Sequence, residues 1–220
     1  MTRAFAPLAA LLALALAGQQ TGPASGQRPV HGRLFPPREL GLLEGPDRDA
    51  WQKPEQIMDA LGIADGSVVA DLGAGGGWFT IRLARRVGPN GMVYAEDIQP
   101  QMIESIRRRV QREGLPNVTA VLGTPSDPGL PAGRIDAVLV VDTYNEIEDP
   151  VALLRNLGQA LSPRGRIGIV DFTKEGGGPG PAMDERVDAE RVVGDAEAAG
   201  LRLLTRETFL RYQYMLIFGR

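Results

Sequence analysis

The stretch most able to do chemistry is "VVADLGAGGGWFT", residues 68–80, where an apolar run passes an acid and enters a glycine-rich loop. This pattern predicts a buried strand followed by a loop whose backbone N–H groups approach a nucleotide-like ligand. A triphosphate loop needs Lys and Ser or Thr after its last glycine, but Trp78 and Phe79 stand there. A pyrophosphate loop needs a glycine at Trp78, and Asp71 would repel phosphate. The motif favours a ligand without phosphate groups; the alternative is a glycine-rich turn that binds nothing.

A pair of acids, Glu96 and Asp97, ends the next apolar run about twenty residues on. A carboxylate at this place in a strand–loop–helix unit commonly accepts hydrogen bonds from two ribose hydroxyls. Asp97 is the better candidate because it stands at the strand end, and we expect Glu96 to point to the opposite face. The alternative for Asp97 is a surface acid or a helix cap.

Two further polar clusters follow later apolar runs. "GTPSD", residues 123–127, includes Thr124, which could meet an adenine edge, although the loop is also rich in ordinary turn formers. "VVDTYNEIEDP", residues 140–150, brings polar groups to the end of a strongly apolar strand, where a substrate would meet a cofactor; the alternative is that they only cap the next helix. The polar residues of this second cluster are Asp142, Thr143, Tyr144, Asn145 and Glu146.

The elements that must position these residues are alternating strands and helices. Strands are predicted at 67–72, 92–98, 117–123, 134–142, 166–172, 201–209 and 212–219. Helices are predicted at 54–63, 78–87, 100–114 and 149–165, and one or two helices at 183–200. Strands that alternate with helices pair in parallel through right-handed crossovers. The final two strands have no helix between them, so the last one should be antiparallel. The fold class is therefore α/β, with a doubly wound, mostly parallel seven-stranded sheet and an antiparallel last strand at its edge. Ligands bind beyond the carboxyl ends of the strands in such sheets.

The N-terminus is typical of an export signal. Arg3 precedes an apolar run, residues 7–17, that is too short to span a bilayer and ends in the small-x-small pattern Ala15-Leu16-Ala17. We therefore expect a signal peptide at 1–17, a flexible arm at 18–53 and the main domain at 54–220, with the mature protein in the periplasm. The alternatives are an uncleaved anchor and a misassigned start. If the segment is not a signal at all, we expect the protein in the cytoplasm.

Composition excludes several classes of chemistry. The chain has no cysteine and one histidine, His31, which lies before the main domain. Thiol nucleophiles, thiolate metal sites, histidine-based metal clusters and Ser-His-Asp triads are excluded, so no metal site is predicted. The net charge of −3 and the lack of a basic cluster argue against a nucleic-acid partner.

With these motifs in place, the chain from about 54 to 220 resembles the class I S-adenosylmethionine-dependent methyltransferases. Four motifs carry the resemblance in order: "VVADLGAGGGWFT", the acid of "VYAEDIQPQMI", "RIDAVLVVDTYNEIEDP" and "LSPRGRIGIVDF". The resemblance implies S-adenosylmethionine as cofactor and methyl transfer as the reaction. Since the chain lacks a basic face for nucleic acid, we expect the methyl acceptor to be a small molecule. It places the methionine part at Asp71 and Gly73, the ribose at Asp97 and the adenine against Ile98. The cofactor-binding set that it implies is Asp71, Gly73, Ala74, Gly75, Asp97, Ile98, Thr124 and Asp142; Thr124 stands where the family often has an acid.

Residues 45–58 look like the segment that precedes the first helix in a bacterial subgroup with export signals. This resemblance implies that Arg48, Trp51 and Gln52 fold over the cofactor cleft as a lid; the alternative is that Trp51 only docks the arm. That subgroup often has a histidine near Asn145, which itself cannot act as a base.

If the reaction needs a base, Asp142, Tyr144 or Glu146 must supply it. The glycine-rich segment 174–185 could act as a mobile gate. Two other functions stay open: a non-catalytic S-adenosylmethionine- or nucleotide-binding protein on the same scaffold, and a nucleotide-dependent oxidoreductase, which Trp78 disfavours.

Overall fold

The structure is a computed structural model that describes residues 1–2 and 34–220. The expected export signal, from its third residue on, lies outside the described residues, as does His31. In the part that is described, no helix is both long enough and apolar enough to cross a membrane.

A seven-stranded sheet with the order β3-β2-β1-β4-β5-β7-β6 forms the centre of the molecule. Its strands are β1 (Val68–Leu72), β2 (Met92–Asp97), β3 (Val118–Leu122), β4 (Ile135–Val141), β5 (Leu161–Phe172), β6 (Arg202–Glu207) and β7 (Gln213–Gly219). The first five strands pair in parallel, and β7 pairs antiparallel with both β5 and β6. The predicted mostly parallel sheet with an antiparallel last strand is confirmed. The expectation that this strand forms the edge is wrong, because β7 lies between β5 and β6.

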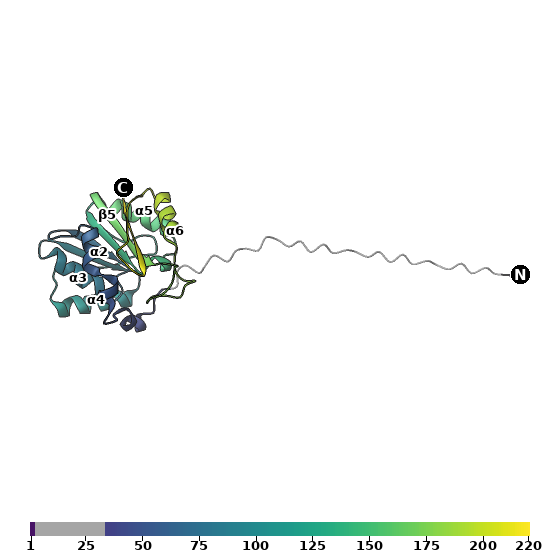
Figure 1. Ribbon diagram of the computed structural model, residues 1–220, viewed down its shortest axis with the longest axis horizontal. Helices are drawn as coiled ribbons and strands as arrows, with labels where there is room; N and C mark the ends of the chain where they lie inside the picture. Colours follow the sequence, from purple (N-terminus) through teal and green to yellow (C-terminus); the bar gives the residue numbers. More distant parts are fainter. Residues whose placement is uncertain (3–33) are drawn as a thin grey trace.

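Helices cover both faces of the sheet (Figure 1). One face carries α2 (Pro54–Ala60), α3 (Trp78–Val87) and α4 (Pro100–Glu113), and the other carries α5 (Pro150–Ala160) and α6 (Ala189–Ala198). Neighbouring residues of β1 divide between the two cores because strand side chains alternate. Val69 packs in the core under α2 and α3, whereas Ala70 and Leu72 pack in the core under α5.

The junction between α5 and β5 differs from the sequence prediction. The predicted helix 149–165 ends at Ala160, and the predicted strand 166–172 begins earlier, at Leu161. Pro163 explains the difference, since a proline disfavours helical backbone in the residue before it and cannot donate a helical hydrogen bond. Leu161 already has extended backbone, with φ −62° and ψ 137°.

Of the one or two helices predicted at 183–200, the structure forms only α6 (Ala189–Ala198). Its start is set by Asp188, whose carboxylate accepts a hydrogen bond from the Glu190 N–H at 2.9 Å. This is the usual N-cap contact, which satisfies a free N–H of the first helical turn.

An arm precedes the main domain and crosses the carboxyl ends of the strands. It contains a 3-10 helix, η1 (Pro37–Leu43), and a short α-helix, α1 (Arg48–Gln52). No residue of η1 is buried, whereas Arg48 and Gln52 of α1 are. The arm is therefore anchored through α1 and lies more loosely at η1.

Candidate active site

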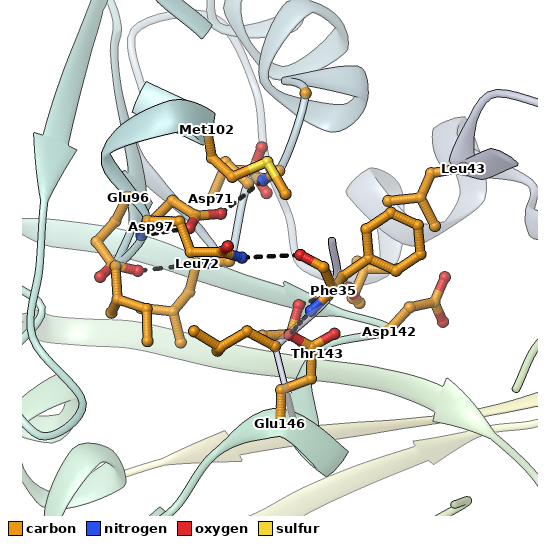
Figure 2. Close-up of a pocket in the computed structure, with 18 of the residues that line it drawn as sticks. Phe35, Leu43, Asp71, Leu72, Glu96, Asp97, Met102, Asp142, Thr143 and Glu146 are labelled. Atoms are coloured by element: carbon orange, nitrogen blue, oxygen red, sulfur yellow. Dashed lines mark hydrogen bonds between the residues drawn. The ribbon is translucent and has the colours of Figure 1, made fainter. Parts of the chain in front are cut away.

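A cavity lies beyond the carboxyl ends of β1, β2 and β4, which is where ligands bind in this class of sheet. It is lined by nine of the ten residues predicted to bind the cofactor or to catalyse: Asp71, Gly73, Ala74, Gly75, Asp97, Ile98, Thr124, Asp142 and Glu146. The tenth, Tyr144, lies outside the cavity. Figure 2 shows the acids on both sides of the cavity, with Asp97 on one side and Glu146 on the other.

The glycine loop after β1 has the conformation that its glycines permit. Gly73 and Gly75 have φ of 66° and 54°, which is left-handed backbone that disfavours other residues. A Cβ at Gly73 would lie 2.4 Å from Thr143 Cγ2, so this glycine also lets the loop after β4 approach. The Gly75 N–H donates to Asp97 Oδ2 at 3.0 Å and fixes the loop to the end of β2.

Asp71 presents a buried carboxylate at the floor of the cavity. Its Oδ2 accepts a hydrogen bond of 2.6 Å from the Thr80 hydroxyl on α3, which orients the side chain. Burial raises the pKa of Asp71 to about 6, against the hydrogen bond from Thr80 and the charge of Arg48, which lower it. A cationic group at this place would favour the ionised carboxylate.

Asp97 accepts two backbone hydrogen bonds, from Gly75 N to Oδ2 and from Gln99 N to Oδ1 at 2.9 Å. Each carboxylate oxygen has two acceptor sites, so both retain capacity for ligand hydroxyls. Burial raises the pKa of this carboxyl above its usual range, and these hydrogen bonds oppose the shift.

Glu96 also lines the cavity, so the expectation that it would point to the opposite face is wrong. Its Oε2 accepts from the Gly73 N–H at 3.4 Å, because this long side chain reaches the glycine loop from the neighbouring strand. Burial and then the charge of Asp97 raise the pKa of Glu96 to about 8.

Part of the cavity lining is apolar and suits a flat ring. Ile98, Met102, Pro125 and Leu153 belong to this lining, as does Thr124. The Thr124 hydroxyl accepts from the Asp127 N–H at 3.0 Å and lies 3.2 Å from the Asp127 carbonyl. Thr124 therefore forms a turn and also borders the cavity.

Asp142 is held by three side chains, two of them from the arm. Its Oδ2 accepts from Gln52 Nε2 at 3.1 Å and from Arg48 Nη2 at 3.4 Å, and its Oδ1 accepts from Gln213 Nε2. Asp142 has φ 54°, an uncommon conformation for a residue other than glycine. Burial raises the pKa of Asp142 to about 6, against the opposing effects of Arg48, Gln52 and Gln213. Asp142 is thus better placed to anchor the arm than to remove a proton.

Of the three residues expected to form a lid, Arg48, Trp51 and Gln52, only Arg48 lines the cavity. Its guanidinium lies 4.2 Å from the Trp78 ring centroid. Gln52 is fully buried in the Asp142 cluster. Trp51 does not line the cavity; its ring centroid lies 5.9 Å from that of Phe172, so it docks the arm.

Tyr144 cannot serve as the base at this site. Its side chain is buried, and its hydroxyl donates to Asp195 Oδ2 on α6 at 3.0 Å. Burial and the charge of Asp195 raise its pKa well above the usual range. The turn after β4 directs Tyr144 into the core, which removes it from the candidate bases.

Glu146 remains as the candidate base. Its Oε2 accepts from the Phe35 N–H at 3.0 Å. Burial, and less so the charge of Asp97, raises the pKa of Glu146 to about 7, opposed by this hydrogen bond. A carboxylate with a pKa near 7 is well suited to accept a proton at neutral pH.

The segment expected to act as a gate, residues 174–185, does not line the cavity. The buried Arg186 guanidinium donates to the carbonyls of Thr173, Pro179 and Pro181 at 3.0–3.2 Å and gives the segment a defined shape.

The residues lining the cavity are strongly acidic. Among the described residues of the lining, Arg48 is the one cation, and it contacts Asp142. Within residues 1–2 and 34–220, no group of three or more His, Cys, Asp or Glu residues could hold a metal ion. The acids of the lining are Glu44, Asp71, Glu96, Asp97, Asp142, Glu146 and Glu148.

Several residues of the site were not identified from sequence. Thr80 on α3 orients Asp71, and Gln213 on β7 orients Asp142. The backbone N–H of Phe35 donates to Glu146, and that of Gln99 donates to Asp97. Of these residues, only Thr80 had a signal in the sequence. It is the third residue of the helix after the glycine loop, a position from which a side chain can face back toward the strand.

Comparison with known proteins agrees with this geometry. Residues 69–165 match the family described as a methyltransferase domain. The crystal structure of a SAM-dependent methyltransferase from Aquifex aeolicus superposes with a TM-score of 0.80 and 28% identity, covering 84% of this chain and 98% of that one. Residues 69–165 thus carry a methyltransferase domain, and the chain has the fold of an S-adenosylmethionine-dependent methyltransferase.

Two curated relatives are similar to part of the chain. An uncharacterized methyltransferase of Mycobacterium tuberculosis is 32% identical over 164 residues, which cover 72% of this chain and 60% of the relative. A ubiquinone/menaquinone biosynthesis C-methyltransferase of Pasteurella multocida is 30% identical over 118 residues, which cover 53% of this chain and 44% of the relative. The matched region thus spans less than two thirds of the length of either relative.

Proposed function

We propose that the protein transfers a methyl group from S-adenosylmethionine to a small-molecule acceptor. The observation that carries the proposal is the cavity at the strand ends, where Asp71, Asp97 and Glu146 converge with the glycine loop. The methyltransferase family match and the similarity to the Aquifex aeolicus structure support it.

The residues present fit the donor. Asp71 lies at the glycine loop, where its negative charge would stabilise an ammonium and a sulfonium, and a bound cation would also favour the ionised form of Glu96, whose pKa is raised to about 8. Arg48, in the same lining, is able to meet a carboxylate. Asp97 would accept the ribose hydroxyls, and the apolar side chain of Ile98 would lie against the adenine.

When bound, S-adenosylmethionine supplies an electrophilic methyl group. The chain's own contribution is to orient the reactants and exclude water, which can lower a barrier by about 7–11 kcal/mol. Glu146 would accept the proton of an acceptor hydroxyl, amine or acidic carbon. Since only its ionised form can do so, the rate should rise as pH increases through about 7.

A small uncharged acceptor fits the lining better than an anionic one. Arg48, the cation of the described lining, contacts Asp142 and would also meet the donor's carboxylate, and the other ionisable side chains of the described lining are acids. The relative named for ubiquinone and menaquinone biosynthesis supports a small-molecule acceptor.

Thermal unfolding in the presence of candidate ligands tests donor binding. At a millimolar concentration, S-adenosylmethionine and S-adenosylhomocysteine should each raise the melting temperature, because a ligand that binds only the folded state stabilises it. NADH and ATP at the same concentration should not. A shift with NADH and none with S-adenosylmethionine would favour the oxidoreductase; a shift with S-adenosylmethionine but no turnover would favour the non-catalytic binding protein.

We further propose that residues 1–17 are a signal peptide and that the mature protein is periplasmic. The sequence pattern around Ala15-Leu16-Ala17 supports this. Expression of the full chain with a C-terminal tag in a Gram-negative host should give a periplasmic product whose first residue is Gly18. A cytoplasmic product that keeps its N-terminus would contradict it.

A further inference from the structure

The peptide group of Phe35 bridges two sides of the cavity. Its N–H donates to Glu146 Oε2 at 3.0 Å, and its carbonyl accepts from Gln99 Nε2 at 3.1 Å. Gln99 in turn donates its own backbone N–H to Asp97. One residue of the arm thus joins the candidate base after β4 to the candidate ribose acid after β2, and Figure 2 shows Phe35 between them.

The rest of the arm lies over the glycine loop. A Cβ at Gly76 would meet Leu40 at 3.4 Å, and one at Gly75 would meet Leu40 and Leu43 at 3.8 and 4.0 Å. Arg109 of α4 pairs with Glu44 and donates to the Gly76 carbonyl at 3.2 Å. Residues 34–44 therefore form the outer wall of the cavity.

This outer wall is weakly held compared with the rest of the arm. η1 buries no residue, Leu42 is 75% exposed, and Phe35 is half-buried. The segment that follows is anchored by the buried Gln52 and by Lys53, which donates to the Phe209 carbonyl at 2.8 Å. A segment with few buried contacts, attached to a firmly anchored one, can open locally without unfolding the domain.

We propose that residues 34–44 form a lid that closes over the bound donor, and that the Phe35 peptide is its latch and also positions Glu146. This inference rests on the proposed function. Opening the lid breaks both hydrogen bonds of the Phe35 peptide, the one to Gln99 and the one to Glu146. Release of S-adenosylhomocysteine and release of the Glu146 side chain therefore occur in the same motion.

The dissociation rate of S-adenosylhomocysteine tests the latch without knowledge of the acceptor. Trp78 lines the cavity and provides a fluorescence signal for stopped-flow displacement. Phe35→Pro removes the donating N–H, and Gln99→Ala removes the other hydrogen bond. Each variant should release the ligand about 3- to 30-fold faster, as expected for the loss of one hydrogen bond. Leu42→Ala changes the exposed surface of the same lid and should leave the rate unchanged.

Two substitutions of Glu146 separate the positioning contact from the charge. Glu146→Gln keeps an oxygen that accepts from the Phe35 N–H, so its release rate should stay near that of the wild type. Glu146→Ala removes this acceptor and should release the ligand as fast as Phe35→Pro. Combining Glu146→Ala with Phe35→Pro should give no further increase, since both remove the same hydrogen bond.

The possible outcomes separate the two proposals. If the wild type binds S-adenosylhomocysteine and both Phe35→Pro and Gln99→Ala release it at the wild-type rate, the latch is refuted and the proposed function stands. If Glu146→Gln releases the ligand as fast as Glu146→Ala, the positioning role is refuted. If the wild type binds neither S-adenosylmethionine nor S-adenosylhomocysteine, the proposed function fails, and the latch with it.

Discussion

Asp171 is the buried acid to which the proposed mechanism gives no role. It lies at the end of β5, 1% exposed, and its Oδ1 accepts from the Phe172 N–H at 2.7 Å. Its Oδ2 has no hydrogen-bond partner among the residues that the structure describes. Burial, and then the charge of Asp142, raises the pKa of Asp171 to about 8. We therefore expect Asp171 to be protonated in the folded protein at neutral pH.

A stability measurement against pH tests this expectation. The pKa of Asp171 is higher in the folded state than in the unfolded state, so its protonation stabilises the folded protein. This contribution to the free energy of unfolding is fully present below about pH 4 and is lost as pH rises toward about 8. Relative to Asp171→Asn, the wild type should lose up to about 1.4 kcal/mol of unfolding free energy per pH unit between pH 5 and 7.

Urea denaturation at several pH values provides the comparison. Glu197→Gln, which alters an exposed acid on α6, serves as the control and should follow the wild type. A difference between the wild type and Asp171→Asn that stays constant with pH would show that Asp171 is ionised throughout.

At the scale of elements, the site depends on how closely the loops after β1 and β4 pack. Gly73→Ala would place a Cβ 2.4 Å from Thr143 Cγ2 at a φ of 66°, so both a clash and backbone strain arise. Gly62→Ala is a matched control, because Gly62 has φ 70° and a Cβ there would meet nothing within 4 Å. We expect Gly73→Ala to be less stable than Gly62→Ala by about 1–3 kcal/mol.

A second substitution isolates the clash. Thr143→Ala removes the nearest atoms and should recover part of the loss in the Gly73→Ala background. Equal losses for Gly73→Ala and Gly62→Ala in urea denaturation would show that the loops move apart easily, and would remove the steric reason for this glycine.

The elements themselves were largely predictable from sequence, and the reasons can be named. The helix at 78–87 matches α3 at both ends, because a glycine stands just before it and another directly after it. The predicted α5–β5 junction differs from the observed one because the apolar pattern of residues 157–161 fits either element, and only Pro163 marks the end of the helix. The glycine loop and Asp97 could be assigned because local motifs place them at strand ends.

Side-chain direction and long-range contacts were less predictable. Tyr144 follows β4 as Glu146 does, yet the 3-10 turn η2 (Tyr144–Glu146) sends one side chain into the core and the other into the cavity. Strand alternation predicts that Glu96 faces away from Asp97, but its long side chain at the strand end reaches the glycine loop and lines the cavity. The contact between Phe35 and Glu146 joins residues 111 apart, and no local pattern encodes it.

At the scale of the whole molecule, the arm and the segment after β5 meet on one aromatic ring. Trp51 contacts Phe172 from one side, and the Arg186 guanidinium lies 5.2 Å from the Phe172 ring centroid. Since both groups pack on the same ring, the energies of Trp51→Ala and Arg186→Ala should not be additive. We expect an interaction energy of about 0.5–1.5 kcal/mol in a double-mutant cycle.

Unfolding free energies of the two single variants and the double variant measure this coupling. Trp51→Ala combined with Glu197→Ala is the control pair, whose effects should add because Glu197 lies exposed on α6. Additivity of Trp51→Ala with Arg186→Ala would mean that the arm and the later segment are held independently.

The central claim is that this cavity binds an adenosyl donor through Asp97. Isothermal titration of S-adenosylhomocysteine into the wild type, Asp97→Asn and Glu197→Gln tests it most directly. We predict that the wild type and Glu197→Gln bind with equal affinity and that Asp97→Asn binds about 10- to 100-fold more weakly, as expected for hydrogen bonds to a charged group. Equal affinity of Asp97→Asn and the wild type, or no binding by the wild type, would contradict the account.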